Sequence, residues 1–140
     1  MNAAYLWAQL EQAETIQQNR MNTWNAYNTF FSNELKSRDI TLPVVPAECV
    51  HNAHMFYIKL PSLEMRTRFI SYMKENGILC VFHYVPLHSS PAGIKFGQFS
   101  GTDVYTTADS ERLVRLPLYY NLKSEDLSFI LDKLRSFFNA

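Results

Sequence analysis

Apolar residues recur with a helical period over the first part of the chain, which contains neither glycine nor proline up to residue 42. The positions that step by three or four residues are Leu6, Leu10, Ala13, Gln17, Arg20, Trp24, Tyr27, Phe31 and Leu35. This pattern predicts a helix over residues 1–38, about 50 Å long. Because Tyr5, Leu6 and Trp7 place apolar groups almost all round its first turns, two interpretations stay open. It is a long core helix, or a helix cut out of a larger protein whose other parts once covered it.

Two runs with the alternation typical of strands follow, over residues 50–60 and 78–88. They hold all four histidines, His51, His54, His83 and His88. The first run has one apolar face and one mixed face. The second is apolar on both faces, so we expect it to be the central strand of the sheet. A histidine in such a strand is either a core group with a hydrogen-bond partner or a group directed at a functional site.

Turn and capping residues divide the middle of the chain. Residues 39–50 contain two prolines and are predicted to be a connector. Ser62 is expected to cap a helix that ends at Asn76 and Gly77, where glycine allows a left-handed turn. Residues 89–101, with one proline and three glycines, are predicted to be a loop.

The last part of the chain predicts a helix, a strand and a helix. Thr106 and Asp109 have the spacing of a capping box for a short helix to Leu113. A third strand is indicated by the alternation of Val114, Leu116 and Leu118. Pro117 places this strand at an edge or at its own end, and Ser124 begins the final helix. The order predicts an α+β fold in one domain over residues 1–140, with the sheet-and-helix part over residues 50–140.

Composition narrows the class of protein. The chain has 140 residues, 47% of them apolar and 19% charged, which is enough for one domain with a core. Its 13 lysines and arginines balance 13 aspartates and glutamates, and no basic block stands out. Nucleic acid and membranes are therefore not expected partners. No long apolar run predicts a membrane span, and two cysteines without a pairing pattern fit a reducing, cytoplasmic compartment.

These residues alone do not define a catalytic site. No carboxylate or cysteine lies at ligand spacing from the histidines, so a metal site is not expected. Cys80 and His83 point to opposite sides of a strand and have no orienting acid, so a hydrolase is not expected. Arg112 and Arg115 flank the third strand and are interpreted as part of a solvated edge.

Four runs carry a resemblance to a known family. They are NAAYLWAQLE, HNAHMFYIKL, GILCVFHYVPLHSSPAG and SERLVRLPLYYNL, in this order. Together they resemble the C-terminal part of the sugar aminotransferases of the DegT/DnrJ/EryC1/StrS family, in particular members that act in enterobacterial common antigen synthesis. The resemblance covers essentially the whole chain. It implies the small C-terminal domain of a fold-type-I enzyme, an antiparallel sheet covered by helices and preceded by a long linking helix.

The resemblance also implies a cofactor and partners. Members of the family use pyridoxal 5′-phosphate (PLP), act on nucleotide sugars, and form dimers or larger oligomers with active sites at the subunit boundary. Their Schiff-base lysine and phosphate-binding residues lie upstream, in a large domain. No lysine of this chain has the sequence context of the Schiff-base lysine. The chain alone is therefore expected to be catalytically incomplete and to hold no cofactor.

The resemblance assigns candidate substrate-binding residues as well. The family pattern places the segment of His83 and Tyr84 beside the bound nucleotide sugar, and the segment of Asn52 and His54 near the domain junction. His88 is a further candidate, and each of the five is alternatively a structural polar group at a strand end. A different class of protein also stays open, a self-standing α+β module for ligand binding or interaction without enzyme activity. An upstream reading frame that encodes a lysine-bearing large domain would distinguish the two.

Overall fold

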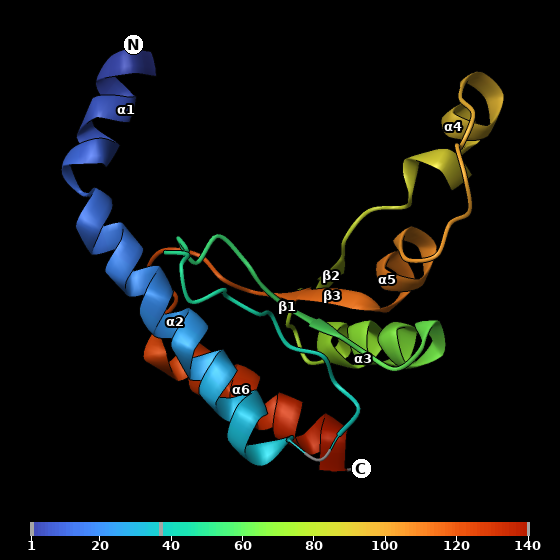
Figure 1. The fold of residues 1–140 in the computed structure, drawn as a ribbon. Coiled ribbons are helices and arrows are strands. Elements are labelled where there is room, and N and C mark those ends of the chain that lie inside the picture. Colours follow the sequence, from blue (N-terminus) through green and yellow to red (C-terminus); the bar gives the residue numbers. More distant parts are fainter. Residues whose placement is uncertain (1, 37, 140) are drawn as a thin grey trace. The chain divides into compact units, whose positions relative to one another are not determined.

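The computed structural model describes residues 2–36 and 38–139 (Figure 1). Its helices are α1 (Asn2–Glu11), α2 (Ala13–Glu34), α3 (Leu63–Glu75), α4 (Pro91–Phe96), α5 (Thr106–Arg112) and α6 (Ser124–Asn139), with a 3₁₀ turn η1 (Leu87–Ser89). Its strands are β1 (Phe56–Lys59), β2 (Val81–Phe82) and β3 (Leu113–Leu116), in the order β1-β3-β2. The fold is α+β with a small antiparallel sheet, as expected from the sequence.

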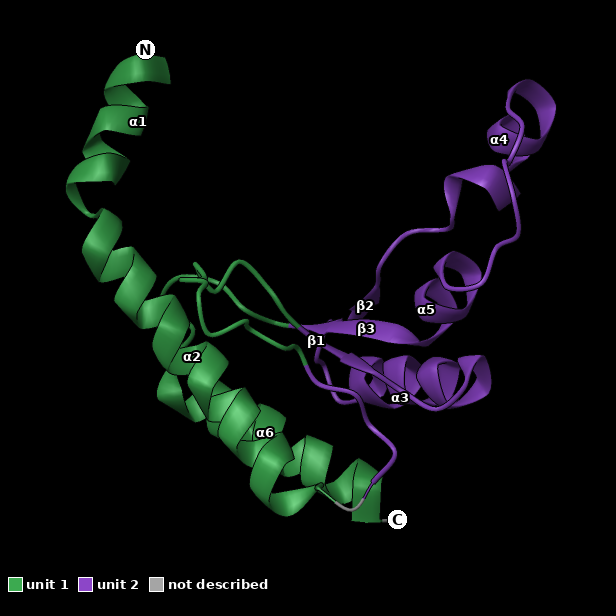
Figure 2. Cartoon of the chain, in the orientation of Figure 1, with its two compact units in different colours: residues 1–36, 43–56, 117–140 green, residues 37–42, 57–116 purple. Residues whose placement is uncertain are grey.

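The chain forms two compact units (Figure 2). Unit 1 contains residues 1–36, 43–56 and 117–140, and unit 2 contains residues 37–42 and 57–116. Unit 1 is built on α2 and α6, whereas unit 2 consists of the sheet from Tyr57 onward with α3, α4 and α5. The expectation of one domain over the whole chain stays a prediction.

The long N-terminal helix is present as two helices. Gln12 interrupts it with φ −105° and ψ 10°, and its amide donates to the carbonyl of Gln9 at 3.1 Å in a tighter turn. The prediction of one continuous helix is therefore wrong at this residue. The buried face of α2 contains Trp24, Tyr27 and Phe31, as the period predicted, whereas α1 has no buried residue.

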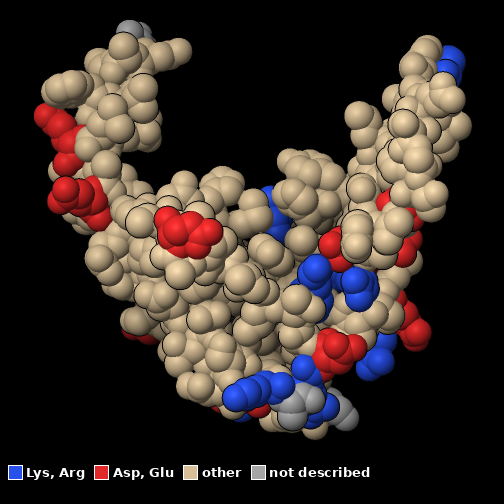
Figure 3. Space-filling view, viewed as in Figure 1, with Lys and Arg blue, Asp and Glu red and all other residues tan. Residues whose placement is uncertain are grey.

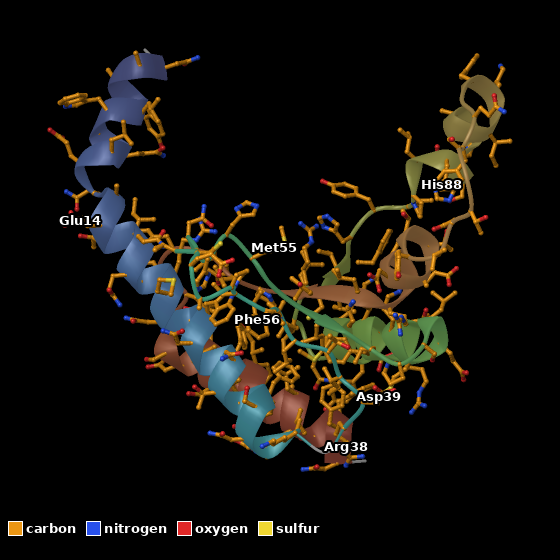
Figure 4. All side chains as sticks on the ribbon, viewed as in Figure 1. Glu14, Arg38, Asp39, Met55, Phe56 and His88 are labelled. Carbon is orange, nitrogen blue, oxygen red and sulfur yellow. The ribbon has the colours of Figure 1, made fainter. Side chains whose placement is uncertain are left out.

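The core of unit 1 is aromatic. The rings of Trp24, Tyr27 and Phe31 surround Phe56 at centroid distances of 5.3, 5.2 and 6.0 Å. Phe56 is fully buried, and its place against α2 is visible in Figure 4. From α6, which begins at Ser124 as predicted, the residues Ile130, Leu134 and Phe138 are buried.

Unit 2 is built on α3 and the sheet. Ser62 accepts a hydrogen bond from the amide of Met65 at 3.1 Å, and Gly77 has φ 76°, so both predicted ends of this helix are confirmed. Phe69 and Met73 on α3 are fully buried. The sheet contributes Ile58, Val114 and Leu116 to the buried apolar residues of this unit, and Leu60, which follows β1, is buried as well.

The order of the strands differs from the prediction. The central strand is β3, and β2 lies at an edge with two residues only. A run that is apolar on both faces need not form the central strand. Phe82 lies in such a run and is nevertheless 45% exposed. Its ring instead contacts the guanidinium of Arg66, 5.2 Å from the centroid. Pro117 follows the last residue of β3, which confirms the predicted placement of this proline at a strand end.

The first predicted strand is also shorter than residues 50–60. Residues 50–55 belong to unit 1 and form no strand. Carbonyl groups of this segment instead accept hydrogen bonds from side chains of α2. Gln17 donates to the carbonyl of His51 at 3.2 Å, and Arg20 donates to the carbonyls of Ala53 and His54 at 3.1 and 2.6 Å. Ala53 has φ 46°, a value that a strand does not contain.

Residues 89–101 are a loop only in part, because Pro91–Phe96 form the helix α4. Ser90 caps α4 by accepting a hydrogen bond from the amide of Gly93 at 3.0 Å, and proline stands at the start of this helix. The capping box at Thr106 is wrong as well. Asp103 accepts from the amides of Thr106 and Thr107 at 2.9 and 3.2 Å, whereas Asp109 is engaged by basic side chains.

Candidate functional site

The predicted site residues His83 and Tyr84 follow the end of β2 directly. Tyr84 has φ 53°, and this left-handed conformation turns the chain away from the sheet. Its carbonyl accepts a hydrogen bond from the hydroxyl of Ser110 at 2.8 Å, which ties the turn to α5. The ring of Tyr84 is 71% exposed and meets the ring of His83 edge-on, with centroids 4.9 Å apart. The structure therefore presents a tyrosine ring beside a half-buried imidazole.

His83 carries an unsatisfied polar atom. Its Nδ1 is sealed from solvent and has no hydrogen-bond partner among the described residues. A buried ring nitrogen without a partner costs about 1–3 kcal/mol relative to a satisfied one. Of the two sequence interpretations, a satisfied core histidine does not fit this nitrogen. The imidazole has the property expected of a group whose partner is not part of the described chain.

The predicted site residue His88 lies elsewhere in unit 2, at η1 (Figure 4). Its Nε2 lies 3.0 Å from Oδ2 of Asp103 and 3.4 Å from the hydroxyl of Thr107. Its ring contacts Phe99 at 4.4 Å between centroids. Hydrogen bonds from Thr107 are the main cause that lowers the pKa of the Asp103 carboxyl below its usual value, and His88 adds to this effect. His88 therefore already has protein partners, unlike His83.

A cleft of about 600 Å³ lies next to His88. Its walls come from η1, α4 and the following segment, and its largest lining side chains are Leu87, Phe96 and Phe99. The lining is mostly apolar and includes no lysine. It therefore lacks the amine that would bind the aldehyde of PLP.

The predicted site residues Asn52 and His54 belong to unit 1. The side-chain oxygen of Asn52 accepts a hydrogen bond from the amide of His54 at 3.0 Å, an Asx turn that fixes the local backbone. The side chain of His54 is exposed. In the same segment His51, which was not predicted as a site residue, accepts from the amide of Ala53 at 3.3 Å and packs on Trp24. These contacts are local to unit 1, and the five candidate residues thus divide between the two units.

Basic side chains line the sheet of unit 2, and one of them was missed as a site candidate. Arg115 on β3 pairs in register with Val81 on β2, and its guanidinium lies 6.0 Å from the ring centroid of Tyr84. Lys59 and Arg112 instead bind Asp109 at 3.2 and 3.1 Å, and the hydrogen bond from Lys59 is the main cause that lowers the pKa of this carboxyl. Charges of both signs are visible on this unit in Figure 3.

Other reactive groups do not add to this site. Cys80 is buried, and desolvation raises the pKa of its thiol to about 12, so it stays protonated at neutral pH. Cys49 is exposed and free. Across residues 2–36 and 38–139, no group of three His, Cys, Asp or Glu side chains could hold a metal ion. Within the same ranges, no helix has the length and apolar character that crossing a membrane requires.

Comparison with known proteins gives the chain its relatives. A protein of Methanocaldococcus jannaschii, the uncharacterized protein MJ1066, is 27% identical in an alignment of 136 positions that covers 91% of this chain and 33% of that protein. Among solved structures, the sugar aminotransferase Spr1654 of Streptococcus pneumoniae, described as putative, matches in its PLP form with a TM-score of 0.75 and 25% identity. The match covers 94% of this chain and 33% of that one.

Other solved structures share the fold at lower identity. The aminotransferase TlmJ of Streptoalloteichus hindustanus matches with a TM-score of 0.80 and 19% identity, over 94% of this chain and 34% of that one. The chain thus spans about a third of the length of the relatives that it matches. The model of the DegT/DnrJ/EryC1/StrS aminotransferase family matches residues 1–135. On this match over nearly its full length, the chain belongs to the DegT/DnrJ/EryC1/StrS aminotransferase family.

Proposed function

We propose that this chain is the small C-terminal domain of a PLP-dependent nucleotide-sugar aminotransferase and that it contributes substrate binding. The observation that carries the proposal is the buried, unsatisfied Nδ1 of His83 beside the exposed ring of Tyr84. The resemblance to the family implies that the segment of His83 and Tyr84 lies beside the bound nucleotide sugar. The share of the relatives that the chain covers, about a third, fits a domain that works with a larger part.

The proposed reaction is transfer of an amino group from glutamate to a dTDP-4-keto-6-deoxyhexose. The four runs that carry the family resemblance also resemble dTDP-4-amino-4,6-dideoxygalactose transaminase, so we assign the chain to synthesis of enterobacterial common antigen or a related lipopolysaccharide. By the same resemblance we place the complete enzyme in the cytoplasm as a homo-oligomer.

PLP supplies the electron sink for this reaction when it is bound. Two observations on the described residues support the expectation that this chain does not form a PLP site by itself. The amine of Lys59 is engaged by Asp109, and the cleft beside His88 has no lysine. We therefore propose that the cofactor is held by the large domain, and that the chain alone does not carry out the reaction.

The role of His83 in this proposal is to hold the substrate. A buried imidazole donates or accepts one hydrogen bond at Nδ1, which suits a sugar hydroxyl or a pyrophosphate oxygen. Tyr84 offers an exposed ring and hydroxyl next to it. We also propose substrate contacts for Asn52, His54 and His88. The side chain of Asn52 accepts from the amide of His54, and His88 lies 3.0 Å from Asp103, whereas the imidazole of His54 is exposed.

The test uses the complete protein encoded by the reading frame that contains this chain. His83→Ala should lower kcat/KM for the nucleotide sugar about tenfold to a hundredfold, because one buried hydrogen bond is worth about 1–3 kcal/mol. The half-reaction with glutamate should stay unchanged. His83→Phe keeps a ring without the nitrogens and should show the same loss. Full sugar turnover in both variants would remove His83 from the site, and a reading frame without a lysine-bearing domain would favour the interaction module instead.

A further inference from the structure

One turn of α2 holds the segment that carries His54. Arg20 donates from Nε to the carbonyl of Ala53 at 3.1 Å and from Nη2 to the carbonyl of His54 at 2.6 Å. On the same helix, the side-chain amide of Gln17 donates to the carbonyl of His51 at 3.2 Å. All of these residues belong to unit 1, and the segment forms no strand. Side chains of the helix therefore hold a backbone that no sheet pairing holds.

The backbone of this segment is strained. Ala53 has φ 46° although it carries a side chain, and it is buried. A non-glycine residue rarely takes this left-handed conformation, and it persists only where neighbouring contacts hold it. The amide of Ala53 donates to Nδ1 of His51, and the amide of His54 donates to the side chain of Asn52. The turn is thus held at its amides by its own side chains and at its carbonyls by α2.

The two bonds from Arg20 reach both sides of one residue. The carbonyl of Ala53 precedes the α carbon of His54, and the carbonyl of His54 follows it. With both peptide planes held, the direction of the bond from the α carbon to the side chain of His54 is fixed. A guanidinium is suited to this task, because its planar fork bonds two acceptors at once and its charge strengthens both bonds.

We propose that Arg20 is a positioning residue, which holds the two peptide groups around His54 and so orients the imidazole of His54 toward the nucleotide sugar. This inference rests on the proposed function, in which His54 contacts the substrate. The imidazole is exposed and therefore accessible to a ligand, whereas Arg20 is occupied with the backbone. Arg20 acts through His54 and has no substrate contact of its own in this role.

Asn19 provides a matched control on the same turn of α2. Its side-chain oxygen accepts a hydrogen bond from the amide of Asn121 at 2.8 Å, and Asn121 has φ 67°. Asn19 thus holds a second left-handed residue, in a different segment of unit 1. If these bonds only stabilise the unit, loss of either side chain should affect turnover alike. If Arg20 positions His54, loss of Arg20 alone should affect the substrate.

The experiment measures amino transfer to dTDP-4-keto-6-deoxyhexose by the complete protein whose reading frame contains this chain. Arg20→Gln should raise the KM for this sugar about tenfold and change kcat less than about twofold, because the lost bonds act on the binding geometry. Arg20→Lys should give an intermediate rise, since it keeps the charge without the fork. Asn19→Ala should change KM less than about twofold. In a His54→Ala background, Arg20→Gln should add nothing, because no imidazole is left to position.

Hydrogen exchange of backbone amides tests the positioning without a ligand. In Arg20→Gln, the amides of Ala53 and His54 should exchange at least about tenfold faster, whereas in Asn19→Ala only the amide of Asn121 should do so. If Arg20→Gln does not fold, Arg20→Lys provides the same comparison. Unchanged exchange at residues 53 and 54, or an equal rise of KM with and without the imidazole of His54, overturns the proposal.

Failure of the proposed function gives a different result. A complete protein that transfers no amino group to the sugar would refute that function, while faster exchange of the two amides would still support Arg20 as the residue that orients His54. Faster exchange together with a rise of KM that disappears in the His54→Ala background supports both.

Discussion

The two units differ in how they satisfy their buried groups. In unit 1, side chains of α2 bond to carbonyl groups, the hydroxyl of Tyr27 donates to the carbonyl of Pro117 at 2.9 Å, and aromatic rings enclose Phe56. In unit 2, three buried side-chain nitrogens have no partner among the described residues, and they belong to Arg66, His83 and Arg115. The difference indicates that unit 1 satisfies these buried polar groups internally, whereas unit 2 leaves three buried side-chain nitrogens unpaired.

The largest effect should come from breaking the packing of unit 1. Phe56→Ala removes the ring at the centre of the aromatic core and should lower the free energy of unfolding by about 3–5 kcal/mol. Phe96→Ala is the matched change in unit 2, where the ring is 81% exposed. This variant should change the free energy of unfolding by about 0.5 kcal/mol or less. Urea denaturation followed by circular dichroism measures both. Equal losses would show that unit 1 is not the stabilising core.

The next largest effect should come from replacing one histidine in each unit, which should change the free energy of unfolding in opposite directions. His83→Phe removes a buried unpaired nitrogen and should raise the free energy of unfolding by about 1 kcal/mol. His51→Phe removes the acceptor for the amide of Ala53 and should lower it by about 1 kcal/mol. The same denaturation series tests the pair. A loss of stability in His83→Phe would mean that its ring nitrogens have partners within the chain.

The smallest effect concerns acid stability, where the units should behave alike. A hydrogen bond from Arg135 is the main cause that lowers the pKa of Glu34 in unit 1, and bonds from Thr107 do the same for Asp103 in unit 2. Since both folded-state pKa values are depressed, the stability they add is present above the ordinary values of 4.5 and 3.8 and is lost as pH falls below them.

This acid effect is read from variants that cannot titrate. Glu34→Gln and Asp103→Asn should each flatten the decline of stability with pH between about pH 5 and pH 2, and neither should change its slope near pH 7. The side chain of Glu34 is exposed and that of Asp103 is partly exposed, so solvent screening should keep the effects small. Thermal melts over this pH range provide the measurement. Unaltered acid profiles would show that the two carboxyls titrate normally in the folded state.

Much of the fold could be predicted from local sequence. The ends of α3 followed from Ser62 and Gly77, because a capping hydroxyl and a left-handed glycine act on their own neighbours. The lengths of the strands could not be predicted, since Ala53 and Tyr84 adopt positive φ values that non-glycine residues rarely take. Strand order depends on contacts between distant segments, and the apolar faces around residue 82 gave the wrong central strand.

The candidate site was predictable only in part. His83 stood out because a polar residue interrupted an apolar run. Arg115 gave no such signal, since an arginine between Val114 and Leu116 is typical of any strand with one solvated face. The pairing of Arg115 with Val81 places it beside β2, where its guanidinium lies 6.0 Å from the ring centroid of Tyr84, and that register is a property of the sheet. The contact between Asp103 and His88 could not be predicted either. The segment between them contains α4, whereas its glycines indicated a loop.

The course of the chain through unit 1 has a consequence for its synthesis. The contacts that complete this unit join Tyr27 to Pro117 and Glu34 to Arg135, across 90 and 101 positions of sequence. On a ribosome, α6 can therefore cover the aromatic face of α2 only after residues 124–139 have emerged. Unit 2 lies almost wholly within the interval that is translated meanwhile, so its sheet can assemble first.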